Sequence, residues 1–174
     1  MTTEDADGLV LAMAAELVRL HEGWRQRAYD DATGEPLRPG HTLVGNPTVG
    51  WGRNLRDVGI RRHEAEILLA EDLKEAIGRA RSFAGSVWDG LSVERRSVLT
   101  DMAFNLGGRL MSFRRFRAAL LRGDFEVAAR EMLDSRWARQ VGRRAETLAA
   151  MMRGDAGGRV AFATGTGAVM VRRS

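Results

Sequence analysis

The chain has 174 residues, of which 44% are hydrophobic and 29% charged, values typical of one globular domain or of two small lobes that share a core. Cysteine is absent, which excludes a disulfide framework and a thiolate metal site. The formal net charge is +4 and Lys74 is the only lysine, so the arginine-rich surface favours anionic partners such as nucleic acid, an acidic membrane or an anionic cell-wall polymer.

The N-terminal segment has the pattern of an amphipathic helix. Apolar residues recur there at three- and four-residue steps and form one stripe: Leu9, Met13, Leu17 and Leu20. Gly23 follows where a left-handed cap would end such a helix. The first residues are acidic where a signal peptide would be basic, and Glu16 interrupts the apolar stretch long before the roughly 20 residues of a membrane span. We therefore expect no signal peptide, no transmembrane segment and no stable membrane insertion.

Residues 25–59 are rich in glycine and proline, which separate short segments such as 42–44 and 48–49. This pattern predicts a small irregular β lobe. After Gly59 the apolar spacing predicts a connecting helix at about 61–83 and a helical lobe at about 92–153. Within that lobe we expect helices at 93–106, 113–121, 125–133, 137–141 and 143–152. Ser92 and Asp124 are the expected N-caps, and Gly107 with Gly108 ends a helix.

The expected fold class is therefore α+β, with a small β lobe and a larger helical lobe joined by a long helix. A cleft between two lobes suits a long ligand. We divide the chain into a catalytic domain at 1–154 and a Gly-rich basic tail at 155–174. Alternation around Gly165-Thr166-Gly167 predicts a hairpin in that tail, and a flexible tail is the alternative.

Glu22, Asp31 and Thr48 are candidates for cleaving a glycosidic bond. That reaction needs one carboxylic acid to protonate the leaving oxygen and a second group to handle water or the developing positive charge. Glu22 ends the first helix, whose partial negative charge tends to keep a proton on it. Asp31 follows nine residues later and Thr48 lies in a glycine-bracketed turn. Asp30 is the rival to Asp31, and turn formation is the structural alternative for the pair.

The three histidines do not share a metal-ligand spacing. His63-Glu64-Ala65-Glu66 lacks the second histidine of a zinc-protease helix, and His21 and His41 stand far from it in the sequence. We expect no metal and no cofactor.

One known family shows the same order of residues. Glu22-Gly23, then Tyr29 and Asp31, then Thr48-Val49-Gly50-Trp51-Gly52-Arg53-Asn54-Leu55 resembles the bacteriophage-type lysozymes, glycoside hydrolase family 24, which are muramidases used as endolysins. The resemblance extends over roughly residues 9–153. The chain departs from the shortest members by an extra stretch between Asp31 and Thr48, at 32–47.

The resemblance implies a lysozyme-like fold and a role for each matching residue. Glu22 would be the general acid, Asp31 the second carboxylate that stabilises positive charge and orients water, and Thr48 the neighbour of that water. Arg144 would pair with the catalytic glutamate across the cleft. Supporting or substrate-binding roles would also fall to Tyr29 and Asn105. The family reaction is inverting, which places the two carboxyl groups roughly 6.5–9.5 Å apart.

The implied activity is hydrolysis of the β-1,4 bond between N-acetylmuramic acid and N-acetylglucosamine in peptidoglycan, for bacterial lysis. The enzyme would act as a monomer without cofactor or nucleic acid, and would wait in the host cytoplasm until a separate pore protein released it. Three alternatives stay open. They are a lytic transglycosylase acting on the same bond, a basic nucleic-acid-binding helical domain, and a lysozyme-like piece of a phage tail or a binding module.

Overall fold

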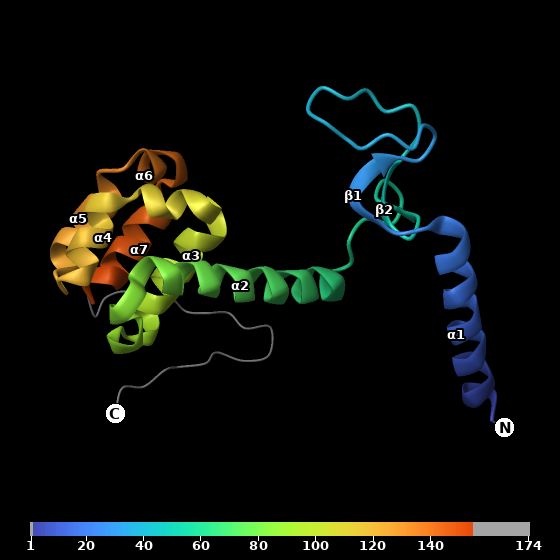
Figure 1. The fold of residues 1–174 in the computed structure, drawn as a ribbon, viewed down its shortest axis with the longest axis horizontal. Helices are drawn as coiled ribbons and strands as arrows, with labels where there is room; N and C mark the ends of the chain where they lie inside the picture. The colour runs from blue at the N-terminus through green and yellow to red at the C-terminus, as the bar shows by residue number, and fades with distance from the viewer. Residues whose placement is uncertain (1, 155–174) are drawn as a thin grey trace. The chain divides into compact units, whose positions relative to one another are not determined.

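The computed structural model describes residues 2–154, so the hairpin expected at 155–174 lies outside the described residues. The chain divides into two compact units with the boundary between Ile67 and Leu68 in the sequence. Unit 1 contains α1 and a small sheet, and unit 2 contains the remaining helices (Figure 1). The α+β class is confirmed.

Helix α1 spans Thr3–Glu22 and begins well before the apolar stripe. Its start is fixed by a capping box, in which the Asp5 N–H donates to the Thr2 hydroxyl and the Thr2 N–H donates to the Asp5 carboxylate. At its end Gly23 has φ 68° and ψ 160°. The expected left-handed cap is therefore wrong: φ is positive, but ψ is extended and leads the chain directly into a strand.

Three short strands follow α1 and form an antiparallel sheet in the order β1-β2-β3. They span Arg25–Asp30, Pro47–Gly50 and Arg53–Asn54. Thr48 on the central strand lies opposite Tyr29 on one side and Asn54 on the other. Its central position leaves Thr48 only 3% exposed.

The segment at 42–44, which the sequence suggested as extended, contains no strand. The N–H groups of Val44 and Gly45 donate to the Asp30 carboxylate, at 2.6 and 2.9 Å, instead of to a neighbouring strand. A buried carboxylate needs such donors, and Asp30 is fully buried at the end of β1. The hydrogen bonds that the Asp30 carboxylate accepts from Val44 and Gly45 therefore determine the conformation of this segment.

Helix α2 spans Arg62–Ala84 and starts at an ion pair within unit 1. The Arg53 guanidinium donates two bonds to the Glu64 carboxylate, at 2.8 and 2.6 Å, and a third to the Gly59 carbonyl at 2.7 Å. The Arg61 N–H also donates to Glu64. That backbone bond and then the Arg53 guanidinium hold the pKa of Glu64 below its usual value, against the opposing effect of burial.

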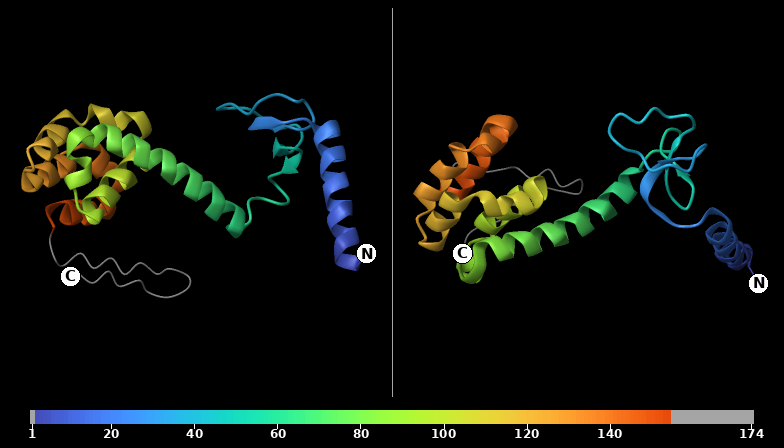
Figure 2. Two further views of the ribbon diagram at one scale, coloured as in Figure 1. Left: turned by 60° about the horizontal axis from the view of Figure 1, so that its bottom comes forward. Right: turned by 45° about the horizontal axis from the view of Figure 1, so that its top comes forward.

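Unit 2 contains the later part of α2 and a compact group of helices (Figures 1 and 2). These are η1 Gly85–Gly90, α3 Val93–Leu106, η2 Gly107–Ser112, α4 Arg114–Leu121, α5 Phe125–Leu133, α6 Arg136–Val141 and α7 Arg143–Arg153. The expected α-helices agree within one residue at each end, and the predicted caps are confirmed because Ser92 and Asp124 accept from Arg95 and Val127 N–H groups. The two 3₁₀ helices were not expected.

The described core of unit 2 is built mostly from alanine and leucine, with smaller numbers of aromatic residues and methionines. Phe83 and Phe116 pack with ring centroids 5.3 Å apart, and Met102, Met132 and Met152 are fully buried in the same core. Helix α7 packs against α3, α5 and α6. No helix within residues 2–154 combines the length and apolar character needed to cross a bilayer.

The Glu64 ion pair predicts a specific dependence of stability on pH. Since the pKa of Glu64 is lowered on folding, this carboxylate stabilises the fold above the ordinary glutamate value, and the contribution is lost as the pH falls through the lowered value. Glu64→Gln is therefore expected to lower Tm at pH 7 and to flatten the fall of Tm from pH 7 to about 3. Calorimetry across this range measures both. The exposed carboxylate removed by Glu66→Gln on the same helix is the control, and parallel Tm curves for all three proteins would contradict the prediction.

Candidate active site

Glu22 is the last residue of α1, and its carboxylate lies against the turn between β2 and β3. A Cβ atom built on Gly52 would stand 2.8 Å from Glu22 Oε2 and 3.1 Å from its Cδ, closer than a side chain tolerates. Gly52 also has φ +74°, a conformation that glycine adopts without cost. Gly52 is therefore favoured for two reasons, its positive φ and the close approach of Glu22.

An aromatic pair that the sequence reasoning did not single out stands beside this turn. The rings of Trp24 and Trp51 lie 4.6 Å apart at 50°, and the Arg19 guanidinium lies 5.6 Å from the Trp51 ring. Both tryptophans are exposed, at 59% and 44%. Their positions in the sequence, close to the candidate site residues, could have indicated them: Trp24 follows Glu22 by two residues, and Trp51 separates the two glycines of the turn. Such exposed rings offer apolar area to a ligand.

Asp31 lies in the turn after β1, where Asn46 binds it. The Asn46 N–H donates to Asp31 Oδ1 at 2.7 Å and the Asn46 side-chain Nδ2 donates to Oδ2 at 3.3 Å. In return, the Asp31 N–H donates to the Asn46 carbonyl at 3.0 Å. Asp31 keeps an exposed position, so its carboxylate is fixed but accessible.

Asp30, the rival carboxylate, has a different environment. Its side chain is fully buried and accepts from the N–H groups of Ala32, Val44 and Gly45 at 3.0, 2.6 and 2.9 Å. The Val44 bond, with the other two, holds the pKa of Asp30 below its usual value although burial opposes this. Asp30 is therefore occupied in holding the loop, and Asp31 is the carboxylate of the pair that a ligand can reach.

Thr48 completes the group within unit 1. Its hydroxyl donates to the Asn46 carbonyl at 3.3 Å. Glu22 therefore meets the sheet at the turn that follows β2, Asp31 meets it just before β2, and Thr48 lies on the strand between them. Tyr29, the other predicted residue of this unit, pairs with Thr48 across the sheet, and the Arg25 guanidinium lies 5.0 Å from its ring.

The predicted residues of unit 2 have partners within that unit. Arg144 donates from Nε to Asp101 Oδ1 at 2.9 Å, and its Nη2 lies 2.9 Å from Oδ2 of the same carboxylate. The Asn105 side-chain carbonyl accepts from Trp137 Nε1 at 2.8 Å, and Trp137 is buried. Asp101 was not anticipated as a partner, and the pairing of Arg144 with Glu22 stays a prediction.

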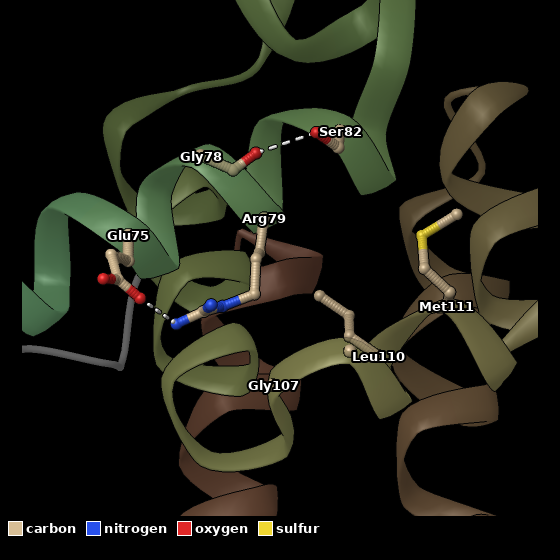
Figure 3. A pocket seen from close by; sticks show the side chains of 8 residues that line it. Glu75, Gly78, Arg79, Ser82, Gly107, Leu110 and Met111 are labelled. Atoms are coloured by element: carbon tan, nitrogen blue, oxygen red, sulfur yellow. Dashed lines mark hydrogen bonds and ion pairs between the residues drawn. The ribbon is translucent and has the colours of Figure 1, made fainter.

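Two pockets differ in their relation to these residues. One of about 430 Å³ lies in unit 2 between α2 and η2, where Glu75 and Arg79 form an ion pair (Figure 3). None of the predicted site residues lines it. The other, of about 390 Å³, lies in unit 1 and is lined by Trp24, Arg25, Gln26, Arg27, Tyr29, Pro36, Leu37 and Arg38. Unit 1 also holds Asp31 and Thr48, whose side chains both bind Asn46. Within residues 2–154 no three acidic or histidine side chains gather as metal ligands.

Comparison with known proteins shows which family the chain resembles over most of its length. The family model described as phage lysozyme matches residues 19–153. The chain is also similar to the pre-baseplate central spike protein Gp5 of Enterobacteria phage T4, with 30% identity over 151 residues. This match covers 77% of the present chain and 26% of that protein, so the chain spans about a quarter of its relative's length.

The contact between Gly52 and Glu22 can be tested with two alanine substitutions. Gly52→Ala and Gly50→Ala both force a residue with Cβ into positive φ, +74° and +68°, at a cost of about 1–2 kcal/mol each. A Cβ on Gly50 meets only a Trp24 ring atom at 3.7 Å, an ordinary contact. We expect similar losses in urea unfolding, whereas only Gly52→Ala displaces Glu22 and lowers cell-wall cleavage by about 100-fold. Equal activity in the two variants would show that the contact is unimportant.

Proposed function

The chain belongs to the phage lysozyme family, and we propose that it is a muramidase that hydrolyses the β-1,4 bond between N-acetylmuramic acid and N-acetylglucosamine in peptidoglycan. The observation that carries this proposal is the placement of Glu22 and Asp31 at opposite ends of β2, with Thr48 between them.

An inverting reaction needs room for a water molecule between the two carboxyl groups, which stand roughly 6.5–9.5 Å apart in such enzymes and about 5 Å apart in retaining ones. Glu22 meets the chain at Gly52, in the turn after β2, and Asp31 meets it at Asn46, before β2. Contacts on either side of this four-residue strand support the wider separation and the inverting reaction.

Glu22 would act as the general acid. It ends α1, and its carboxyl group lies against the turn between β2 and β3. A neutral Glu22 can donate its proton to the glycosidic oxygen as the bond from that oxygen to the anomeric carbon breaks. The exposed rings of Trp24 and Trp51 lie close by and offer an apolar surface to the sugar.

Asp31 and Thr48 would hold the attacking water. Because the Thr48 hydroxyl donates its proton to the Asn46 carbonyl, its oxygen presents lone pairs, so it can accept a hydrogen bond from water. Asp31 accepts the other water proton and takes it up as the water oxygen bonds to the anomeric carbon. The water attacks the face opposite the leaving group, which inverts the anomeric configuration.

The positive charge of the chain suits the substrate. The formal net charge is +4, and peptidoglycan carries carboxylates, so the enzyme and its polymer attract each other. This attraction is screened by salt. In the proposed role the enzyme acts as a monomeric endolysin that a separate pore protein releases to the wall.

A second biological setting for the same chemistry is favoured by the similarity to a central spike protein. In that setting the lysozyme region would be a component of a phage particle and would open the wall during entry. Mass spectrometry of purified particles separates the two settings, because an endolysin is absent from the particle. A lytic transglycosylase is the less suitable alternative, since it uses no water and has no need of Asp31 with Thr48.

Digestion of purified peptidoglycan tests the proposed reaction. The wild-type chain is expected to release muropeptides with reducing ends, and NMR of the fresh product is expected to show the α-anomer. Anhydro ends would establish a transglycosylase instead, and a fresh β-anomer would establish retention.

Substitution of the proposed acid gives the second test. Glu22→Gln is expected to lower the rate by on the order of 10²–10⁴ while circular dichroism and Tm stay those of the wild type. Glu16→Gln is the matched control, because Glu16 lies on the same helix and pairs only with Arg19 in the described contacts. Comparable cleavage by Glu22→Gln and Glu16→Gln would show that another residue is the acid.

A further inference from the structure

Asn46 contacts both residues that would hold the water. Its N–H and its side-chain Nδ2 donate to the two oxygens of Asp31, at 2.7 and 3.3 Å. Its carbonyl accepts from the Thr48 hydroxyl at 3.3 Å and from the Asp31 N–H at 3.0 Å. One residue therefore fixes the position of the carboxylate and the direction of the hydroxyl proton.

The orientation of the Asn46 amide is itself fixed. Arg56 Nη1 donates to Asn46 Oδ1 at 3.2 Å, and a guanidinium can only donate. The oxygen of the amide must therefore face Arg56, which leaves Nδ2 to face Asp31. A charged donor on one side and a charged acceptor on the other exclude the flipped amide.

The backbone before Asn46 is held just as firmly. The buried Asp30 carboxylate binds the N–H groups of Val44 and Gly45. A Cβ built on Gly45 would stand 2.1 Å from Asp31 Oδ1 and 2.8 Å from the Ala32 nitrogen. The chain can thus bring Asn46 against Asp31 only because residue 45 has no side chain.

We propose that Asn46 is a positioning residue of the active site, and that the stretch before it serves to deliver Asn46 to Asp31 and Thr48. This inference rests on the hydrolytic function proposed above and extends it. It also gives a role to the extra stretch between Asp31 and Thr48. Within this stretch, Val44 and Gly45 bind Asp30. Asn46 supplies Asp31 with two donors, its backbone N–H and its side-chain Nδ2.

The test replaces the amide by a carboxylate of the same shape. In Asn46→Asp one introduced oxygen faces Arg56 and the other faces Asp31, so ionised Asp31 meets a like charge. The other charged groups around the site, Asp30 with His41 beside it and Arg56, are the same in both proteins. We expect kcat to fall about 10- to 100-fold near neutral pH, KM to change little, and the acid limb of the pH–kcat profile to move up by about 1 unit.

The matched control is Asn54→Asp. Asn54 lies in the same sheet, and its Nδ2 donates to the Asp57 carboxylate at 2.9 Å, so this variant also places two carboxylates together, away from Asp31. It is expected to lose stability as Asn46→Asp does and to keep the pH profile of the wild type. Asn46→Ala, which keeps the backbone N–H bond to Asp31, should show an intermediate loss of kcat. Equal profiles for Asn46→Asp and Asn54→Asp would overturn the proposal.

A measurement without substrate tests the positioning role of Asn46 separately from the proposed hydrolytic function. NMR of the Asp31 carboxyl carbon follows the titration of this group in the wild type, in Asn46→Asp and in Asn54→Asp. We expect the midpoint to move to higher pH in Asn46→Asp alone, and an unchanged midpoint would overturn the contact with Asn46. If the wild type released no muropeptides, the hydrolytic proposal would fail and the role of Asn46 in catalysis with it, whereas cleavage with unshifted Asn46 variants would sink only the positioning role.

Discussion

The Asp30 carboxylate is the interaction on which the β unit depends. It is fully buried and accepts from the nearby Ala32 N–H and from the N–H groups of Val44 and Gly45, which lie 14 and 15 residues further along the chain. An unpaired buried charge is costly, so the loop cannot leave Asp30 without a large penalty. Because the loop is closed in this way, the residue that follows it arrives beside Asp31, and β2 begins where the sheet requires it.

Beyond that loop, the unit relies on polar contacts more than on a hydrophobic core. Its buried residues are Asp30 and Thr48, whereas the apolar core belongs to unit 2. The bidentate pair between Arg53 and Glu64 ties β3 to the start of α2. Charge-assisted bonds of this kind are directional. They fix the positions of individual atoms, which suits an arrangement of catalytic groups better than non-directional apolar packing does.

Structural features that depend on a few neighbouring residues could be predicted from the sequence. The bounds of α3 and α5 follow from apolar spacing and from the caps Ser92 and Asp124, which act on the first turn of their own helices. The conformation of the segment at 42–44 could not be predicted from its own residues, because it depends on hydrogen bonds to Asp30, far away in the sequence. Asp30 and Asp31 are chemically identical neighbours, and only the fold buries one and exposes the other. The pattern also gave no hint of Asn46, because most of its bonds use backbone atoms.

Asp30 holds its loop through main-chain N–H groups, and this has a consequence for how the protein can diversify. Any residue except proline supplies an N–H, so the anchoring makes few demands on the side chains between Thr33 and Leu43. Glycine is required where the backbone demands it: Gly34 and Gly40 have φ of +73° and +80°, and a Cβ on Gly45 would clash with Asp31 and Ala32. The other exposed side chains of the loop can therefore change while Asp30 and Asp31 keep their hydrogen bonds. Surface variation and structural anchoring are separated within one short stretch of chain.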